Sequence, residues 1–232
     1  LAERNDISVK YVLDIVKHDD ISAISTTDFN DILNDPEVSI VAEMMGGSHP
    51  AYDFSKAALL AGKHVVTSNK EVVSKFGTEL LTLARENGVR YLFEASVGGG
   101  IPVIRPIVND LASNKITSID GILNGTTNYI LTQMNSYGTD FSDALKDAQA
   151  KGYAEADPTA DIEGIDAARK IVILSSLAFG KRISPDKIST QGITKITAED
   201  FDMAKELGYT IKLIGHAEAR VVAGVFVLGA GV

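Results

Sequence analysis

Seven charged side chains lie between Gly152 and Lys170. Five carboxylates in this stretch precede an arginine and a lysine, and the apolar segment 171–179 follows directly. Asp166 and Lys170 are four residues apart, so a helix places them on one face. A charged lysine held among acids at a loop-to-helix junction is a candidate proton donor, or a binding group for a polar small molecule.

A simpler interpretation of an acid four residues before a lysine is a solvent-facing ion pair. The apolar residues after Lys170 favour burial instead, and a buried lysine needs carboxylate partners because an unpaired buried charge is costly. The apolar spacing predicts a helix over 162–179, with Thr159 or Asp161 as its N-cap and Glu163 on the face of the acid–lysine pair. The stretch is therefore predicted to be an acidic loop that leads into a core helix.

Composition restricts the function classes. The 232 residues include 45% hydrophobic side chains, enough for the core of one large domain or two small ones. A formal net charge of −9 argues against nucleic acid and anionic membranes as partners. Without cysteines there is no disulfide, thiolate nucleophile or cysteine-bound metal, and the four histidines show no ligand spacing. No apolar run is long enough to cross a membrane and the first residues lack a signal peptide's pattern, so we expect a cytoplasmic protein.

Residues 1–93 alternate short β-rich runs with helical patterns, which is typical of a parallel sheet covered by helices. The expected strands are 9–15, 38–44, 64–67 and 90–95. The expected helices are 28–33 with Thr27 as N-cap, 50–62 with Ser48 as N-cap, and 77–87. These elements predict an α/β domain.

Two places in this half are candidates for ligand contact. The pair Gly46-Gly47 allows a ligand to approach the backbone, although a sharp turn needs glycine without any ligand. Lys70 follows the strand 64–67, and open parallel sheets bind ligands at the carboxyl ends of their strands. Lys70 is therefore better placed for a ligand than most surface lysines.

The opening of a dinucleotide-binding unit is missing from this half. Such a unit begins with a strand that leads into a Gly-x-Gly-x-x-Gly turn. Residues 1–93 contain no strand followed by such a turn. Residues 1–6 have the pattern of a helix end, so we expect the strand and the glycine turn to precede Leu1. The apolar run 221–232 ends without a polar cap, so we expect sequence to follow it.

Residues 94–232 show a different pattern. Segment 96–102 contains three successive glycines, which permit a tight backbone nest, and its carbonyls beside Glu94 are candidate ligands of a small cation. A plain sharp turn explains the glycines equally well. The polar segment 124–128 is compatible with a turn and an N-cap. The expected helices are 102–112, 129–136, 140–150 and 198–208, the last capped by Thr197 with Asp200, and the expected strands are 116–123, 210–217 and 221–228.

Five segments, taken in order along the chain, closely resemble the homoserine dehydrogenases. They are Gly46-Gly47, 61–70, 93–102, 121–131 and 152–170, within a match that runs from about 38 to 216. Each motif is weak alone, but five with matching spacing are specific. The resemblance implies an α/β fold in which 1–93 is a Rossmann-type parallel-sheet domain for NAD(P), without its first strand and Gly-rich turn. It implies an α+β catalytic domain and a dimerisation sheet within 94–232.

The resemblance also implies an activity, the NAD(P)-dependent and reversible reduction of L-aspartate 4-semialdehyde to L-homoserine. This reaction belongs to the biosynthesis of threonine and methionine. Both NAD and NADP stay open as the cofactor. The resemblance further implies a homodimer or a higher homo-oligomer.

Residue by residue, the resemblance places the proton donor at Lys170. The other catalytic residues it implies are Lys70, beside the nicotinamide and the substrate, and Asp166. The substrate-binding residues it implies are Glu155, Asp161, Asp166 and Gly152, and the cofactor-binding residues are Lys70, Gly46, Gly47 and Gly152. It also implies a sodium ion held by Glu94 and the backbones of Val97, Gly99 and Ile101. These roles fit the charges, because an ammonium both stabilises and protonates the alkoxide that hydride transfer leaves, while acids hold the substrate's own ammonium.

Two other functions remain open. Another two-domain aldehyde or hydroxy-acid dehydrogenase would reduce a substrate without an ammonium group faster than one that has it. A non-catalytic dimeric relative would have lost a lysine or an acid of the site. That second alternative is disfavoured, since Lys70, Glu155, Asp166 and Lys170 are all present.

Overall fold

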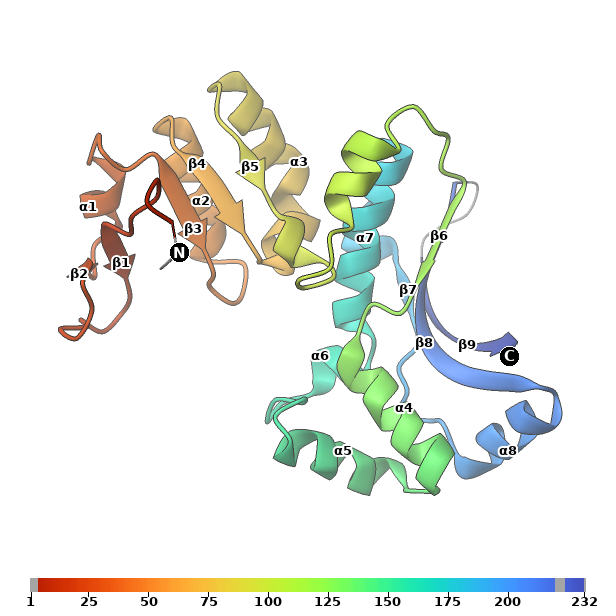
Figure 1. Ribbon diagram of the computed structural model, residues 1–232. Helices are drawn as coiled ribbons and strands as arrows, with labels where there is room; N and C mark the ends of the chain where they lie inside the picture. The colour runs from red at the N-terminus through yellow and green to blue at the C-terminus, as the bar shows by residue number, and fades with distance from the viewer. Residues whose placement is uncertain (1–3, 220–223, 232) are drawn as a thin grey trace. The chain divides into compact units, whose positions relative to one another are not determined.

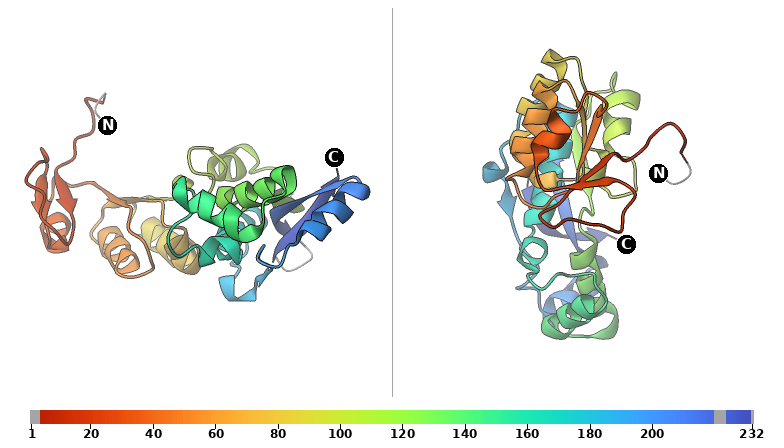
Figure 2. Two further views of the ribbon diagram at one scale, coloured as in Figure 1. Left: turned by 90° about the horizontal axis from the view of Figure 1, so that it is seen from below. Right: turned by 90° about the vertical axis from the view of Figure 1, so that its left-hand side faces the viewer.

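The computed structural model describes residues 4–219 and the backbone of 224–231 (Figures 1 and 2). This part of the chain divides into two compact units. The first contains the residues up to 72 together with 76–93, and the second contains 73–75 together with the residues from 94 onward. Among the described residues, no helix is long and apolar enough to cross a lipid bilayer.

The first unit contains parallel strands, and the connections that follow β2, β3 and β4 each carry a helix. Its strands are β1 (Tyr11–Leu13), β2 (Ile24–Thr26), β3 (Ile40–Glu43), β4 (His64–Thr67) and β5 (Tyr91–Leu92). Its helices are α1 (Phe29–Leu33), α2 (Ala51–Leu60) and α3 (Lys70–Glu86). β1 pairs with β2, and β3, β4 and β5 form a second sheet in that order, with all pairs parallel. Parallel neighbours need crossover connections, so this arrangement confirms the α/β class that the alternating patterns predicted.

The strands of the first unit bury one face. α2 packs against β3 and β4 (Figure 1), and Val65 of β4 and Tyr91 of β5 are buried. Val66 and Leu92 on the opposite face are 41% and 50% exposed. Among the described residues, no strand pairs β1 or β2 with β3, so the five strands of this unit form two separate sheets.

The predicted elements of the first unit are confirmed with corrected ends. The strand 64–67 is confirmed, whereas β1, β3 and β5 are shorter than predicted, and β2 was not predicted because its run is only three residues long. Thr27 is not the N-cap of α1, because the Asp28 side chain accepts the hydrogen bond from the Asn30 backbone. Ser48 is not the N-cap of α2, since its hydroxyl donates to Glu71 at 3.1 Å.

The most consequential correction concerns the start of α3. The helix begins at Lys70 rather than Gly77, because the Asn69 side chain caps it by accepting a hydrogen bond from Val72 N at 3.1 Å. Lys70 is therefore a residue of the first helical turn, not part of a loop.

The second unit packs helices on one face of a mixed sheet. Its helical elements are η1 (Glu94–Ser96), the π-helical turn η2 (Pro106–Asp110), α4 (Gly125–Tyr137), α5 (Phe141–Ala150), α6 (Thr159–Ile162), α7 (Ile165–Phe179), η3 (Pro185–Lys187) and α8 (Ala198–Glu206). Its strands are β6 (Ser118–Gly121), β7 (Ser189–Thr190), β8 (Tyr209–Glu218) and β9 (Gly224–Gly231). The strand order is β6-β8-β9-β7, antiparallel except between β7 and β9.

The core of the second unit lies between this sheet and helices α4 and α7. β8 alternates buried and half-buried residues, so Ile211 and Leu213 point into the core. There they belong to the same cluster as Ile130 of α4 and Ile171 of α7. The opposite face of β8 is half-buried and carries Thr210, Lys212, Ile214 and His216.

Several predictions for the second unit are confirmed and others are wrong. The Thr197–Asp200 capping box, α5 and β8 are confirmed. β9 covers most of the predicted strand 221–228, whose first three residues lie outside the described part. The predicted helix 102–112 is reduced to a π-helical turn, and α4 begins at Gly125 rather than residue 129, because Asn124 caps it.

The predicted continuous helix 162–179 is wrong, because the chain breaks at Gly164. This residue has φ +79°, a left-handed conformation that ends α6 and precedes α7. The break is held from outside by a neighbouring loop, in which Ile193 N donates to Ile162 O at 2.8 Å. A Cβ on Gly192 would collide with Ile162 O, so this close approach requires glycine. Glu163 consequently lies outside α7, and neither Thr159 nor Asp161 caps that helix.

Candidate active site

The predicted acid–lysine pair is buried at the start of α7. Lys170 Nζ lies 2.7 Å from Asp166 Oδ2 and donates to Leu123 O at 2.8 Å. The two side chains are 19% and 5% exposed, so the interpretation as a solvent-facing pair is wrong. Asp166 also lies in the first turn of α7, where the helix dipole favours a negative charge.

A third side chain, Asn124, joins this pair to another predicted acid. Its Nδ2 donates to Asp161 Oδ1 at 2.6 Å and to Asp166 Oδ2 at 2.9 Å. Its Oδ1 accepts from Thr127 N at 2.9 Å, which makes Asn124 the N-cap of α4. Sequence reasoning treated 124–128 as a turn with an N-cap and missed this second role. The available signal was the position of a polar cluster directly after a strand.

The structure thus brings together three of the residues to which the resemblance assigns roles, Asp161, Asp166 and Lys170. Glu155 lies in the exposed loop between α5 and α6, where its carbonyl accepts from Gln149 at 3.1 Å. Gly152, at the end of α5, has φ +73°, which only glycine adopts without strain. This loop is tied to the start of α4, because the Thr126 hydroxyl donates to Tyr153 O at 2.6 Å.

The glycine-rich segment folds around the carboxylate of Glu94. This carboxylate accepts hydrogen bonds from Val103 N at 2.6 Å, Ile104 N at 2.8 Å and Arg105 N at 2.9 Å. Burial by itself raises the pKa of Glu94, but the three backbone donors outweigh it, so the pKa lies below its ordinary value. Glu94 therefore fixes both ends of the segment.

The backbone of the same segment presents carbonyl oxygens. The carbonyls of Glu94 and Gly98 accept from Val97 N and Ile101 N, which folds the segment into two consecutive turns. The carbonyls of Val97, Gly99 and Ile101 are among the other oxygens of this segment. Residues 4–219 contain no group of three or more histidine, aspartate or glutamate side chains that could hold a metal ion. A cation bound here would have to use mainly carbonyl oxygens.

In the first unit, a buried network surrounds the predicted glycine turn. Glu43 is 4% exposed and accepts from Met45 N at 2.7 Å and from the Thr67 hydroxyl at 2.6 Å. Asn69 Nδ2 donates to Met45 O at 3.0 Å and to Gly47 O at 2.8 Å. The turn is thereby fixed beside the first turn of α3, at the carboxyl ends of β3 and β4.

Sequence reasoning named Gly46, Gly47 and Lys70 but missed the residues that support them, Glu43 and Asn69. Lys70 belongs to the first unit and the acid–lysine cluster to the second.

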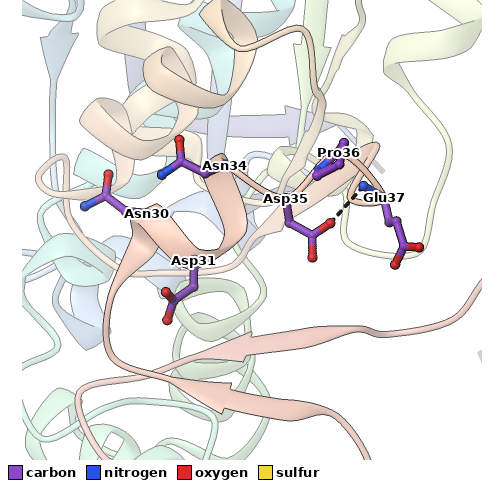
Figure 3. A pocket seen from close by; sticks show the side chains of 6 residues that line it. All are labelled: Asn30, Asp31, Asn34, Asp35, Pro36 and Glu37. Atoms are coloured by element: carbon purple, nitrogen blue, oxygen red, sulfur yellow. Dashed lines mark hydrogen bonds between the residues drawn. The ribbon is translucent and has the colours of Figure 1, made fainter.

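A shallow hollow on the first unit contains none of these residues (Figure 3). It is lined by Asn30, Asp31, Asn34, Asp35, Pro36 and Glu37. Two of its acids already have a cationic partner, since Lys10 Nζ lies 2.6 Å from Asp35 and 2.5 Å from Glu37. The hollow is therefore not a candidate for the chemistry.

Comparisons with known proteins agree along the chain. A family model described as homoserine dehydrogenase matches residues 102–228. A second, described as homoserine dehydrogenase, NAD binding domain, matches residues 5–94. The chain is 49% identical over 197 residues to the homoserine dehydrogenase of Synechocystis sp., which is 85% of this chain and 46% of that protein. It is 45% identical over 213 residues to the Bacillus subtilis homoserine dehydrogenase, 92% of this chain and 48% of that protein.

Solved structures give the same result. The crystal structure of a homoserine dehydrogenase from Thiobacillus denitrificans superposes with a TM-score of 0.86 at 46% identity, covering 90% of this chain and 49% of that one. A hyperthermophilic archaeal homoserine dehydrogenase in complex with NADPH gives a TM-score of 0.76 at 27% identity, covering 93% and 62%. The chain spans about half the length of the curated relatives it matches. These findings confirm the resemblance that the five segments indicated.

The contribution of the Glu94 charge to stability can be tested by varying the pH. Because its pKa in the folded protein lies below the ordinary value of 4.5, its contribution to stability is present above about pH 4.5 and is lost as the pH falls through the folded value. We expect Glu94→Gln to lower the free energy of unfolding by about 2 kcal/mol at pH 7, since hydrogen bonds to a charged acceptor are replaced by neutral ones. Urea unfolding between pH 3 and 7 measures the difference, which should shrink towards pH 3.

Glu206→Gln, an exposed change at the end of α8, is the matched control and should have little effect at any pH. A Glu94→Gln difference that is equally large at pH 3 and pH 7 would contradict the role of the charge.

Proposed function

The chain belongs to the homoserine dehydrogenase family, and from this premise we propose that the protein interconverts L-aspartate 4-semialdehyde and L-homoserine with NAD(P). The observation that carries the proposal is the partly buried cluster of Asp161, Asp166, Asn124 and Lys170. In this cluster, the Asn124 amide joins the two acids, and Lys170 pairs with Asp166. Such a cluster suits a small substrate that has an ammonium group and a carbonyl.

The acids are proposed to hold the ammonium group of the substrate. Asp161 and Asp166 meet at the Asn124 amide, and each carboxylate can accept several hydrogen bonds. Acids that already have partners in the folded chain can therefore take an ammonium as well, and charge-assisted hydrogen bonds make a carboxylate an effective partner for it. Glu155, in the exposed loop before α6, is proposed as a further acid that binds this ammonium group. Gly152 allows the tight turn in the same loop.

Lys170 is proposed as the proton donor in the reducing direction. Leu123 O and Asp166 take two of the three N–H bonds of its ammonium, and we assign the third to the substrate's carbonyl oxygen. When bound, the nicotinamide supplies the hydride. The ammonium of Lys170 then stabilises the alkoxide on that oxygen and transfers a proton to it. In the oxidising direction, the neutral amine accepts the proton again.

The first unit is proposed to hold the cofactor. The turn Gly46-Gly47 follows β3 at the carboxyl edge of a parallel sheet, which is where doubly wound folds bind nucleotides. Lys70, in the first turn of α3, is proposed to contact the nicotinamide and the substrate, and Gly152 is proposed as a further contact of the cofactor and the substrate. The buried network of Glu43 and Asn69 supports this assignment, because it gives the turn one fixed conformation.

The proposed role of Lys170 predicts a large loss of activity on substitution. Lys170→Met keeps the length and apolar stem of the side chain, and it should lower kcat by at least about 100-fold, since general acid catalysis contributes a factor of that order. The KM for NAD(P)H should change little. The matched control is Lys146→Met on α5, an exposed lysine paired only with Asp143 among the described contacts, which should keep full activity.

Steady-state kinetics of the full-length enzyme, followed by cofactor absorbance, measure both variants. Faster reduction of an aldehyde that lacks the amino group would favour a different dehydrogenase. Full activity of folded Lys170→Met would exclude this lysine as the donor.

We propose that the carbonyls of Val97, Gly99 and Ile101, with Glu94, bind a sodium ion. Backbone carbonyls can replace the hydration shell of such an ion, and the two turns of segment 94–101 use the carbonyls of Glu94 and Gly98 rather than these three. Sodium chloride should then raise the melting temperature more than choline chloride at the same ionic strength. Thermal unfolding measures this, and equal effects of the two salts would exclude the ion.

We further propose that the sheet of the second unit pairs two copies of the chain. Its half-buried face carries Thr210, Lys212, Ile214 and His216 of β8, opposite the face that packs on α4 and α7. Ile214→Glu should convert a dimer to monomers, because a carboxylate would be buried without a partner. Light scattering gives the mass, and Lys187→Glu in η3 is the control. A dimer that persists in Ile214→Glu would place the interface elsewhere.

A further inference from the structure

The side chain of Asn124 forms hydrogen bonds with residues of three helices, α4, α6 and α7. As the N-cap of α4 it accepts from Thr127 N at 2.9 Å and from the Thr127 hydroxyl at 3.0 Å. Its two N–H bonds point to Asp161 of α6 and Asp166 of α7. The residue is 5% exposed, so these contacts replace its contacts with water. Oxygen and nitrogen of this amide are both engaged.

The two carboxylates converge on one nitrogen atom. Asp161 Oδ1 and Asp166 Oδ2 are therefore no farther apart than the two hydrogen bonds of 2.6 and 2.9 Å laid end to end. Two like charges at this separation repel each other strongly away from bulk water. The Asn124 amide donates to both carboxylates and offsets part of this repulsion, and the Lys170 ammonium beside Asp166 offsets more of it.

We propose that Asn124 is a positioning residue that couples the binding of the substrate's ammonium to the placement of the proton donor. One N–H orients Asp161 for the ammonium, and the other orients Asp166, which in turn holds Lys170. The inference rests on the proposed function, since it assigns Asn124 a part in that reaction. Asn124 acts through the acids and does not itself touch the substrate.

Substitutions at this position distinguish the role of Asn124 as N-cap of α4 from its hydrogen bonds to Asp161 and Asp166. Aspartate and serine are N-caps of similar quality to asparagine, so Asn124→Asp and Asn124→Ser retain the first turn of α4. Aspartate has nearly the same shape but no N–H to donate, and it adds a third negative charge. Serine is too short to reach both acids. Alanine would lose the cap as well, so Asn124→Ala cannot distinguish the two roles.

The experiment is steady-state oxidation of homoserine by the full-length enzyme and these two variants. We expect kcat/KM for homoserine to fall about 10- to 100-fold in both, because a small misplacement of binding groups costs this much. The KM for NAD(P)+ should stay within about twofold. In Asn124→Asp, the acidic limb of the kcat/KM profile should move to higher pH, since an added carboxylate raises the pKa of its neighbours.

Two controls make the result decisive. Asp140→Ala removes the N-cap of α5, where the Asp140 side chain accepts from Asp143 N, and should lower the melting temperature without changing kcat/KM for homoserine. In the background Asp161→Asn, adding Asn124→Asp should cost less than about threefold more, because the two variants disrupt the same contact. A full additional loss in that background would show that Asn124 acts elsewhere.

The outcomes also separate this inference from the proposed function. If the wild-type enzyme does not oxidise homoserine, the proposed function fails. If the wild type is active and folded Asn124→Asp and Asn124→Ser keep its kcat/KM and pH profile, the inference on Asn124 is overturned. An equal rise in the KM values for homoserine and NAD(P)+ would likewise overturn it, because it would indicate a general structural defect.

Discussion

The buried charge of Lys170 is the constraint on which the second unit depends. An ammonium that is mostly removed from water needs acceptors, and here they are one carboxylate and one carbonyl from a different part of the chain. Leu123 supplies the carbonyl at the end of the connection from β6, and Asp166 supplies the carboxylate one helical turn away. The fold of this unit thus places the segment after β6 beside the first turn of α7.

Glycines make this approach possible at two points. Gly192 lets a loop contact the break between α6 and α7, where any Cβ would collide with Ile162 O. A Cβ on Gly215 of β8 would lie 2.6 Å from Leu123 Cδ1, so any other residue there would require the Leu123 side chain to shift. Both glycines lie far in sequence from the residues they accommodate. Their effect is to set where Asp161 and Leu123 stand relative to α7.

The first unit also buries an ionisable side chain, the carboxylate of Glu43. Glu43 has only neutral donors among its described contacts, namely a backbone N–H and the hydroxyl of Thr67, with Asn69 beside them at 3.5 Å. This network links the ends of two parallel strands to the cap of the next helix. In both units, one asparagine caps a helix with its oxygen and orders a neighbouring segment with its nitrogen.

Features that depend on local spacing could be predicted before the fold was known. Alternating patterns indicated the α/β class, the i,i+4 spacing placed Asp166 beside Lys170, and the Thr197 capping box was visible as a motif. Contacts between distant segments could not be predicted in this way. Asn124 lies 37 and 42 residues from the acids it joins, and the break at Gly164 is fixed by a loop near residue 192. The physical reason is that helix propensity and periodicity act over a few residues, whereas a buried polar group is satisfied by whichever groups the fold brings beside it.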